Sequence, residues 1–561
     1  MKKKLASIFA LVLCAAILLS GCGGGTSGGN SGGGGGSSTP APGTTGDSNT
    51  PETTEGGDTF TFAIVNDPDS LDPGWTDNTF ATPIFSNMSE GLVRYDLDSN
   101  LVPGAAEKWD ISEDGMVYTF TIRSDAKWSD GTDLTAYDFE YAWKRVLDPE
   151  FASRASNKMY PYIKNAEKYF KGEAAIEDVG IVAIDDKTLE ITLETPTSFI
   201  LSIMATWTYY PVNQAVVSEN PDWTKNPDTY ISNGPFKLVK YNLGDELILE
   251  KNEYYWDADA VSLGRIVFKF IPELSTALSA FESGAVDGIK EVPSSEVPRL
   301  RSDESFTPVP TFSTSYYLIN TQQEALNDPR VRKALSMALD RTEIIEDVLQ
   351  ASYSPAMGHV PPGYVTNGED FREVGGYYDL GPTAKIEEAQ ALLAEAGYPN
   401  GEGFPELELG YYTNEVAKKV AESMQQMWKK NLNVDFKITS AEWSVFFVDV
   451  QNLDYGICAM GDLGTFLHPM AFLGTFPSED PPLATGWANA EYDQLLKDII
   501  AETDEAKATE LMHKAEDIFM NDHVLIPTYH KNEQLMMKPY VKNWTMTATG
   551  YYLFDKIVIE K

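Results

Sequence analysis

The chain has 561 residues, of which 42% are hydrophobic, 12% aromatic and 23% charged, the composition of a folded protein rather than a disordered or fibrous one. Its 43 lysines and arginines stand against 84 aspartates and glutamates, which gives a formal net charge of −41. A surface this acidic repels phosphate backbones and anionic lipid headgroups, so we expect no nucleic-acid partner and no basic membrane-binding patch.

The N-terminus has the pattern of an export signal. Lys2, Lys3 and Lys4 form a basic segment, and an apolar run follows from Leu5 to Leu19. The run is shorter than the roughly 17–25 residues of a permanent membrane-spanning helix, so we assign residues 1–21 to a signal peptide. No later segment is long and apolar enough to predict a transmembrane helix.

The signal ends in Leu19-Ser20-Gly21-Cys22, which resembles the lipobox of bacterial lipoproteins. In that motif the cysteine is acylated and becomes the first residue of the mature protein, so the resemblance implies a lipid anchor at Cys22. The alternative is a plain signal peptide with a chance cysteine. Each buried methylene adds about 0.8 kcal/mol of membrane affinity, so two or three acyl chains hold a soluble domain at a membrane.

Beyond the cysteine, the chain up to residue 57 is almost entirely Gly, Ser, Thr, Pro and Asn. We interpret residues 22–57 as a lipid-anchored tether with a root-mean-square span of roughly 30–35 Å. Cys14 leaves with the signal peptide and Cys22 is acylated, which leaves only Cys458. The folded part, residues 58–561, must then be stabilised by its core without a disulfide.

Strand patterns recur through the first half of the chain. Residues 117–122 and 188–193 alternate apolar and polar side chains with period two, and residues 265–271 do so nearly as well. This alternation predicts three strands.

Helix patterns dominate later. Asp328 and Pro329 predict the start of one helix, and apolar residues recur with helical spacing over 386–396, where Gly397 supplies the stop. Because strands and helices intermix throughout, we predict an α/β protein of several sheets.

One loop imitates a calcium site. Asp96 to Asn100 supplies three acidic or amide side chains, and Glu107 stands at the twelfth position. The sixth position is Leu101, where a calcium loop requires glycine, and Pro103 follows. An acidic turn between strands is therefore the favoured interpretation.

Motifs for catalysis and cofactor binding are not found. The five histidines show no metal-ligand spacing, and they stand at positions 359, 468, 513, 523 and 530. The sequence has no P-loop, no dinucleotide fingerprint and no Cys-x-x-Cys motif. We expect no cofactor, no metal site and no enzymatic activity.

Several segments in a fixed order resemble one protein family over residues 60–561. They are Ser70-Leu-Asp-Pro73, Glu90-Gly-Leu-Val-Arg-Tyr95, Ala126-Lys-Trp-Ser-Asp-Gly131, Asn233-Gly-Pro-Phe-Lys-Leu238, Phe281-Glu-Ser-Gly-Ala-Val-Asp287, Asn327-Asp-Pro-Arg-Val-Arg332 and Leu392-Leu-Ala-Glu-Ala-Gly-Tyr398. The sequence is similar to the extracellular solute-binding proteins of peptide and nickel ABC importers, the oligopeptide-binding family in particular.

This resemblance implies a two-lobed periplasmic-binding-protein-like fold that closes on its ligand about a hinge. Lobe one is expected to comprise residues 58–90, 210–310 and 532–561, with an extra subdomain at 91–209. Lobe two is expected at 311–531. In peptide-binding members the ligand lies extended in the cleft between the lobes, where wet pockets accept many side chains.

The segment from Asp454 to Pro469 resembles a cleft-lining run of the peptide-binding relatives, but it differs at three positions. Ala459 stands where the family usually has arginine, Asp462 where it has tryptophan, and Thr465 where it has the aspartate that grips the peptide's α-ammonium. If this chain binds free peptide N-termini, Asp462 is the nearest alternative carboxylate and Asp77 the second. A solvated turn residue is the alternative interpretation of Asp462.

Other positions match the family's cleft directly. Glu442-Trp443 corresponds to a cleft-lining Glu-Trp pair, although a core aromatic is the alternative interpretation of Trp443, and Asp77 matches an acidic position in lobe one. The candidate ligand-binding residues implied by the resemblance are Asp77, Thr79, Trp443, Phe447, Asp462, Thr465 and Phe466.

The implied function is that of a monomeric, lipid-anchored substrate-binding component, which delivers oligopeptides to an ABC permease. It would act at the outer face of the bacterial cytoplasmic membrane, on the periplasmic side if the cell has an outer membrane. One alternative keeps the fold and changes the solute to a modified peptide, an oligosaccharide or a chelated metal. Another is an exported enzyme on the same tether.

Overall fold

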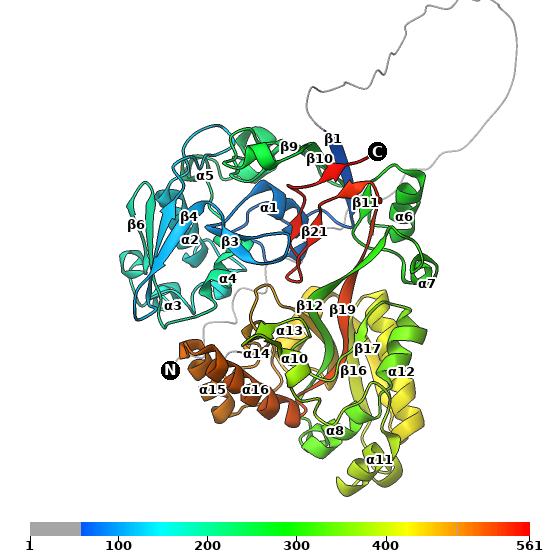
Figure 1. Ribbon diagram of the computed structural model, residues 1–561. Helices are drawn as coiled ribbons and strands as arrows, with labels where there is room; N and C mark the ends of the chain where they lie inside the picture. Colours follow the sequence, from blue (N-terminus) through cyan, green and yellow to red (C-terminus); the bar gives the residue numbers. More distant parts are fainter. Residues whose placement is uncertain (1–57, 480) are drawn as a thin grey trace, which may run out of the picture. The chain divides into compact units, whose positions relative to one another are not determined.

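The computed structural model describes residues 58–479 and 481–561, so the segments assigned to the signal peptide and the tether lie outside it. Strands and helices intermix along this part of the chain (Figure 1). The prediction of an α/β protein of several sheets is confirmed, since the described residues form one sheet of 11 strands, one of four and four of two. No helix among them is long and apolar enough to cross a membrane.

The largest sheet is mixed parallel and antiparallel, with the strand order β17-β16-β18-β12-β19-β11-β1-β10-β9-β8, and β13 also pairs with β19. In chain order its strands are β1 (Asp58–Ile64), β8 (Phe236–Asn242), β9 (Glu246–Lys251), β10 (Leu263–Phe270), β11 (Gly288–Ile289), β12 (Phe306–Ile319), β13 (Ser354–Pro355), β16 (Leu407–Tyr412), β17 (Phe436–Ala441), β18 (Ile457–Leu463) and β19 (Leu525–Met537).

Two strands of this sheet are unusually long. β12 has 14 residues and β19 has 13, and they pair antiparallel from Phe306 opposite Met536 to Leu318 opposite Leu525. One end of β19 also pairs with β11, and the other end of β12 pairs with β18. The two long strands therefore connect the strand group β11-β1-β10-β9-β8 to the group β18-β16-β17.

The predicted strands are present. Residues 117–122 form β5 (Val117–Ile122), residues 188–193 form β7 (Thr188–Thr192), and residues 265–271 lie in β10 and just beyond its end. β5 and β7 belong to an antiparallel sheet of order β4-β5-β7-β6, completed by β4 (Ala106–Ile111) and β6 (Ile181–Asp185). In both strands alternate residues are buried, Tyr118 and Phe120 among them, which accounts for the period of two in the sequence.

The remaining strands are short and pair two by two. They are β2 (Val93–Tyr95) with β3 (Leu101–Pro103), β14 (Val365–Thr366) with β15 (Glu369–Asp370), β20 (Val541–Lys542) with β23 (Val558–Ile559), and β21 (Thr545–Met546) with β22 (Tyr552–Leu553).

The helices are distributed along the whole described chain. They are α1 (Thr82–Met88), α2 (Ala136–Leu147), α3 (Ala166–Phe170), α4 (Ile200–Met204), α5 (Gln214–Glu219), α6 (Leu274–Ser283), α7 (Val297–Leu300), α8 (Pro329–Met337), α9 (Arg341–Glu343), α10 (Phe371–Val374), α11 (Ile386–Glu395), α12 (Glu415–Leu432), α13 (Trp443–Gln451), α14 (Met470–Leu473), α15 (Ala490–Ala501) and α16 (Glu505–Asn521).

Both predicted helix boundaries are confirmed. A carboxylate oxygen of Asp328 accepts a 2.9 Å hydrogen bond from the backbone N–H of Arg330, and Pro329 is the first residue of α8. α11 ends at Glu395, and Gly397 follows with a φ of +102°, a left-handed conformation that favours glycine.

The acidic turn is also confirmed, between β2 and β3. Oδ1 of Asp96 accepts backbone hydrogen bonds from Asp98 at 2.9 Å and from Asn100 at 2.8 Å. The carboxylate is thus used to close the turn. The described residues contain no group of three or more potential metal ligands.

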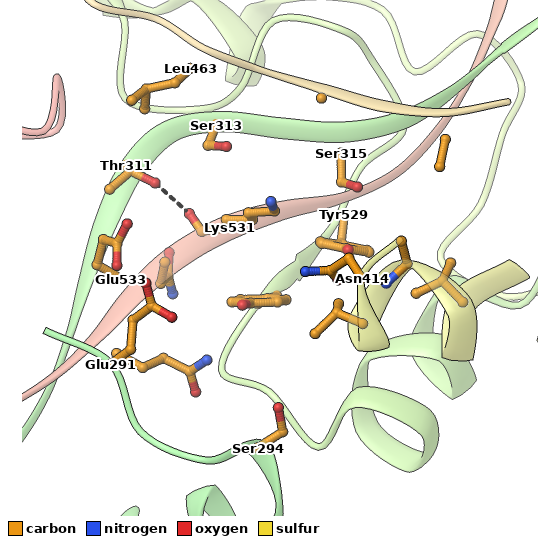
Figure 2. Close-up of a pocket in the computed structure, with 18 of the residues that line it drawn as sticks. Glu291, Ser294, Thr311, Ser313, Ser315, Asn414, Leu463, Tyr529, Lys531 and Glu533 are labelled. Atoms are coloured by element: carbon orange, nitrogen blue, oxygen red, sulfur yellow. Dashed lines mark hydrogen bonds between the residues drawn. The ribbon is translucent and has the colours of Figure 1, made fainter. Parts of the chain in front are cut away.

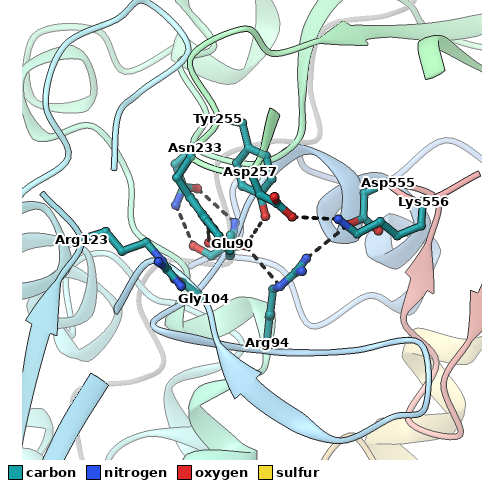
Figure 3. A network of polar contacts seen from close by, with 10 residues as sticks. Glu90, Arg94, Gly104, Arg123, Asn233, Tyr255, Asp257, Asp555 and Lys556 are labelled. Carbon is teal, nitrogen blue, oxygen red and sulfur yellow. Dashed lines mark hydrogen bonds and ion pairs between the residues drawn. The ribbon is translucent and has the colours of Figure 1, made fainter. Parts of the chain in front are cut away.

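A buried polar network joins segments that are far apart in the chain (Figure 3). Oε2 of Glu90 accepts a 2.5 Å hydrogen bond from the Tyr255 hydroxyl, and Oε1 accepts one of 2.8 Å from the Trp256 indole. Arg94 lies 3.6 Å from Glu90 and 3.3 Å from Asp555. Burial raises the pKa of the Glu90 carboxyl, and Arg94 partly offsets that effect. The network fixes three distant segments to one another.

Candidate functional site

A cavity of about 410 Å³ lies beside the two long strands (Figure 2). Its walls come from β12, β18 and β19, from the segment after β11, and from the start of α12. The cavity is therefore lined by the two strands that connect the strand groups, by strands of the group β18-β16-β17 and by the segment that follows β11. A space of this size fits a small ligand or part of an extended one.

Alternation along two paired strands forms one wall of this cavity. Ser313 and Ser315 of β12 lie opposite Leu463 and Gly461 of β18, and all four line the cavity. Side chains two residues apart point to the same face of a sheet, which brings these positions together. Small side chains at three of these four positions leave the space open. Met460 and Asp462 of β18 also line the cavity.

Four tyrosines are among the residues that line the cavity. Tyr353 and Tyr529 stack with ring centroids 5.2 Å apart, and Tyr412 is in edge contact with Trp443 at 5.3 Å. Tyr317 also lines the cavity, and its side chain is only 2% exposed. The Tyr317 hydroxyl is buried without a hydrogen-bond partner among the described residues.

Besides Asp462, three charged residues line the cavity, and Figure 2 labels these three. Glu291 follows β11, and Lys531 and Glu533 belong to β19. Burial raises the pKa of the Glu291 carboxyl, and the neighbouring Glu533 raises it further, while Lys290 and Lys531 partly offset these effects. The cavity wall therefore holds one carboxylate, that of Glu291, in surroundings that disfavour its charge.

A second, smaller cavity of about 180 Å³ holds two of the residues singled out in the sequence. Thr465 and Phe466 line it, together with Lys158. Phe466 stacks on Phe199 with centroids 5.9 Å apart. Burial lowers the pKa of the Lys158 ammonium, and Asp77 partly offsets this. The basic side chain that lies beside Thr465 is thus in surroundings that disfavour its charge.

The other candidates occupy different places. Thr79 lines a small cavity of about 30 Å³ that shares Glu533 with the large one, whereas Asp77 is exposed. Trp443 is 50% exposed and therefore not a core aromatic, and Phe447 packs against it with centroids 5.6 Å apart. The structure thus places these candidates around more than one cavity.

Asp462 lines the large cavity between Gly461 and Leu463 of β18, and its carboxylate is bonded within the protein. Its Oδ2 accepts a 2.8 Å hydrogen bond from the Tyr316 hydroxyl and lies 3.0 Å from Nε2 of His359. The Asp462 side chain is 17% exposed. This carboxylate is thus already bound within the protein.

The sequence reasoning missed Glu291, Lys531, Glu533, Tyr317 and Lys158. The sequence held a signal for Lys531 and Glu533, because the polar run from His530 to Gln534 interrupts an otherwise apolar strand pattern. Charged residues in the middle of a long buried strand need a reason, and the cavity supplies it. No comparable local signal marked Glu291, Tyr317 or Lys158.

Known proteins resemble this chain over nearly its full length. The model for the family described as bacterial extracellular solute-binding proteins, family 5, matches residues 100–482. The oligopeptide-binding protein OppA of Bacillus subtilis is 35% identical over 559 residues, covering 98% of this chain and 99% of that protein. The dipeptide-binding protein DppE of the same organism is 37% identical, covering 87% and 89%.

Solved structures give the same result. A periplasmic oligopeptide-binding protein from Borrelia burgdorferi aligns with a TM-score of 0.77 and 34% identity, over 89% of this chain and 99% of that one. The expected two-lobed periplasmic-binding-protein-like fold is thereby confirmed. These relatives are binding proteins and not enzymes. The chain belongs to the bacterial extracellular solute-binding proteins of family 5.

Proposed function

We propose that the protein is the lipid-anchored substrate-binding component of an ABC importer, that it binds oligopeptides in the large cavity beside β12 and β19, and that it delivers them to a membrane permease. The observation that carries this proposal is the cavity itself, because it is lined by β12 and β19, which connect the two strand groups, by β18 and by the segment after β11. The names of relatives such as OppA and DppE support the choice of peptide as ligand.

The chemistry of the cavity suits an extended peptide. Hydroxyls of Ser313 and Ser315, the amide of Asn414 and the hydroxyl of Tyr317 line the walls. Such groups can bond a peptide backbone directly or through water without selecting one side chain. An importer that accepts many peptides needs this kind of site.

We further propose that β12 and β19 act as the hinge of a closing motion. They pass between the two strand groups, and their register shifts between Pro310 and Thr314 and again between Ser315 and Tyr316. Pro308 and Pro310 remove two backbone donors from this part of β12. The lobes would comprise residues 58–90, 210–310 and 532–561 on one side and 311–531 on the other, with the subdomain 91–209.

The location follows from the N-terminus, which lies outside the described residues. Acylation at Cys22 would hold the protein at the outer face of the cytoplasmic membrane, and residues 22–57 would let the monomeric folded part reach its permease. No basic surface is needed for this attachment.

A specific observation keeps a modified ligand as the second candidate. Thr465 shares its cavity with Lys158, and no carboxylate among residues 58–479 and 481–561 lines this cavity to receive a peptide α-amine. A peptide with a blocked amine would fit such a site better than a free one.

Mass spectrometry of the ligand retained through mild purification tests the proposal. We expect short peptides from the unmodified protein and none from Ser315→Trp, which fills the cavity, while Ser315→Ala retains them as the matched control. Thermal melting must show that all three proteins are folded. An oligosaccharide or a metal chelate in place of peptides would contradict the peptide assignment.

A further inference from the structure

Two carboxylates from distant segments line the same wall of the large cavity. Glu291 belongs to the segment after β11, and Glu533 belongs to β19. Figure 2 shows both side chains on the same side of the cavity. Each is partly buried. Two like charges in such a place cost free energy unless a cation accompanies them.

The protein itself supplies no such cation at contact distance. Among the described residues, no ion pair or side-chain hydrogen bond engages either carboxylate, although Lys290 and Lys531 lie near enough to act on Glu291 through space. The Lys290 ammonium lies 5.7 Å from the ring centre of Phe80 and 5.8 Å from that of Tyr552. The pKa of the Glu291 carboxyl is raised above its usual value by burial and by Glu533, in spite of both lysines.

Other buried carboxylates of this protein are paired, which shows that the arrangement is unusual here. Glu90 accepts hydrogen bonds from Tyr255 and Trp256, and Glu516 forms an ion pair with Arg372.

A second observation points to a ligand in the same space. Tyr317 is only 2% exposed, and its hydroxyl has no partner within the described chain. The side-chain oxygen of Gln534 is likewise buried and unpartnered. Both residues line the cavity. Unpaired buried polar atoms are rare in folded proteins unless a ligand or water completes them.

We propose that Glu291 and Glu533 form an acidic subsite that takes a cationic group of the ligand, an ammonium or a guanidinium. This inference rests on the proposed function and adds to it a preference for ligands that carry a cationic group. A carboxylate pair accepts the several N–H donors of such a group. The stacked rings of Tyr353 and Tyr529 line the same cavity and offer aromatic faces to the cation.

The cation can come from a lysine or arginine side chain or from the peptide α-amine, and one experiment separates these sources. The full-length protein in detergent is incubated with an equimolar degenerate pentapeptide mixture, either free or N-acetylated, and the retained peptides are identified by mass spectrometry. Affinities are then measured for penta-alanine carrying a single lysine, or a single norleucine, at the enriched position.

The double variant Glu291→Gln/Glu533→Gln is compared with Glu304→Gln/Glu510→Gln, which removes the same charge at two exposed positions away from the cavity. We expect the unmodified protein and the control to enrich lysine or arginine at one position of the retained peptides. Both should bind the lysine peptide at least about 30-fold more tightly than the cavity variant does. Norleucine peptides should bind both variants alike. If the source is the α-amine, acetylation abolishes the difference instead.

Several outcomes would overturn the proposal. Equal affinity of the unmodified protein for lysine, norleucine and acetylated peptides would show that no cation is taken, while leaving peptide binding intact. Retention of no peptide by the unmodified protein would overturn the peptide function, and this subsite with it. Loss of norleucine peptides by the cavity variant alone would show that the glutamates shape the cavity rather than select charge.

Discussion

Nε2 of His359 lies 3.0 Å from Oδ2 of Asp462, and the same oxygen accepts a hydrogen bond from the Tyr316 hydroxyl. His359 is fully buried, and its backbone N–H donates to Glu516, which also pairs with Arg372. The carboxylate that the sequence offered as a partner for a peptide amine is therefore part of an internal polar network.

For Asp462→Asn we expect a loss of stability rather than a selective loss of free peptides. The amide keeps the shape but weakens the contacts with His359 and Tyr316, at a cost of about 1–3 kcal/mol. Chemical denaturation measures this loss, and calorimetry with free and N-acetylated peptides measures binding. A variant of unchanged stability that loses only free peptides would instead support direct capture of the amine.

Glu291→Gln should stabilise the ligand-free protein at neutral pH and not at pH 4. Burial and Glu533 raise the pKa of this carboxyl, so the folded state holds its proton more tightly than the unfolded state does. The stability of the unmodified protein relative to the variant should therefore fall with rising pH. The fall begins near the pKa that Glu291 has in the unfolded state and ends above its raised pKa in the folded state.

Thermal melting of both proteins from pH 4 to pH 8 checks this sign. Glu304→Gln serves as the exposed control, because it removes the same charge from a side chain that lies in solvent. A difference between Glu291→Gln and the unmodified protein that is independent of pH would contradict the prediction.

Tyr255→Phe should destabilise the protein by about 1–3 kcal/mol, the cost of leaving a buried carboxyl acceptor short of one donor. The Tyr255 hydroxyl bonds Glu90, whose pKa burial already raises. The neighbouring Tyr254 is 41% exposed, so Tyr254→Phe is a matched control with little expected effect. Urea denaturation of both variants gives the comparison. Equal midpoints would show that the network in Figure 3 adds little to stability.

Cys22→Ala should move the protein from the detergent phase to the aqueous phase in a phase-partition experiment. The change removes the only thiol of the lipobox-like segment and with it the acyl chains. Mass spectrometry of the unmodified N-terminus should find the acyl groups. A variant that remains membrane-bound would show that some other segment anchors the protein.

A peptide that bridges both sides of the cavity should stabilise and compact the protein. At a hundred times the dissociation constant the gain in unfolding free energy is about 2.7 kcal/mol. Solution scattering should show a smaller radius of gyration on saturation. Stabilisation without any change in radius would mean that the ligand binds without hinge closure.

The sequence alone determined the local elements. Period-two alternation located β5 and β7, and the Asp328-Pro329 and Gly397 signals bounded α8 and α11 correctly. These features were predictable because a strand face or a helix cap depends on residues that are neighbours in the chain. The two-lobed fold followed from the resemblance of many short segments, which the structural match confirms.

Only the tertiary structure decided which side chains meet in the cavity. Glu291 and Glu533 share a wall because β11 pairs with β19, and Asp462, although it lines the same cavity, has its carboxylate held by Tyr316 and His359. Strand pairing between distant segments sets such neighbours, and the register of a strand sets which face each side chain takes. Whether a buried carboxylate finds a partner depends on both, so it cannot be read from the order of residues.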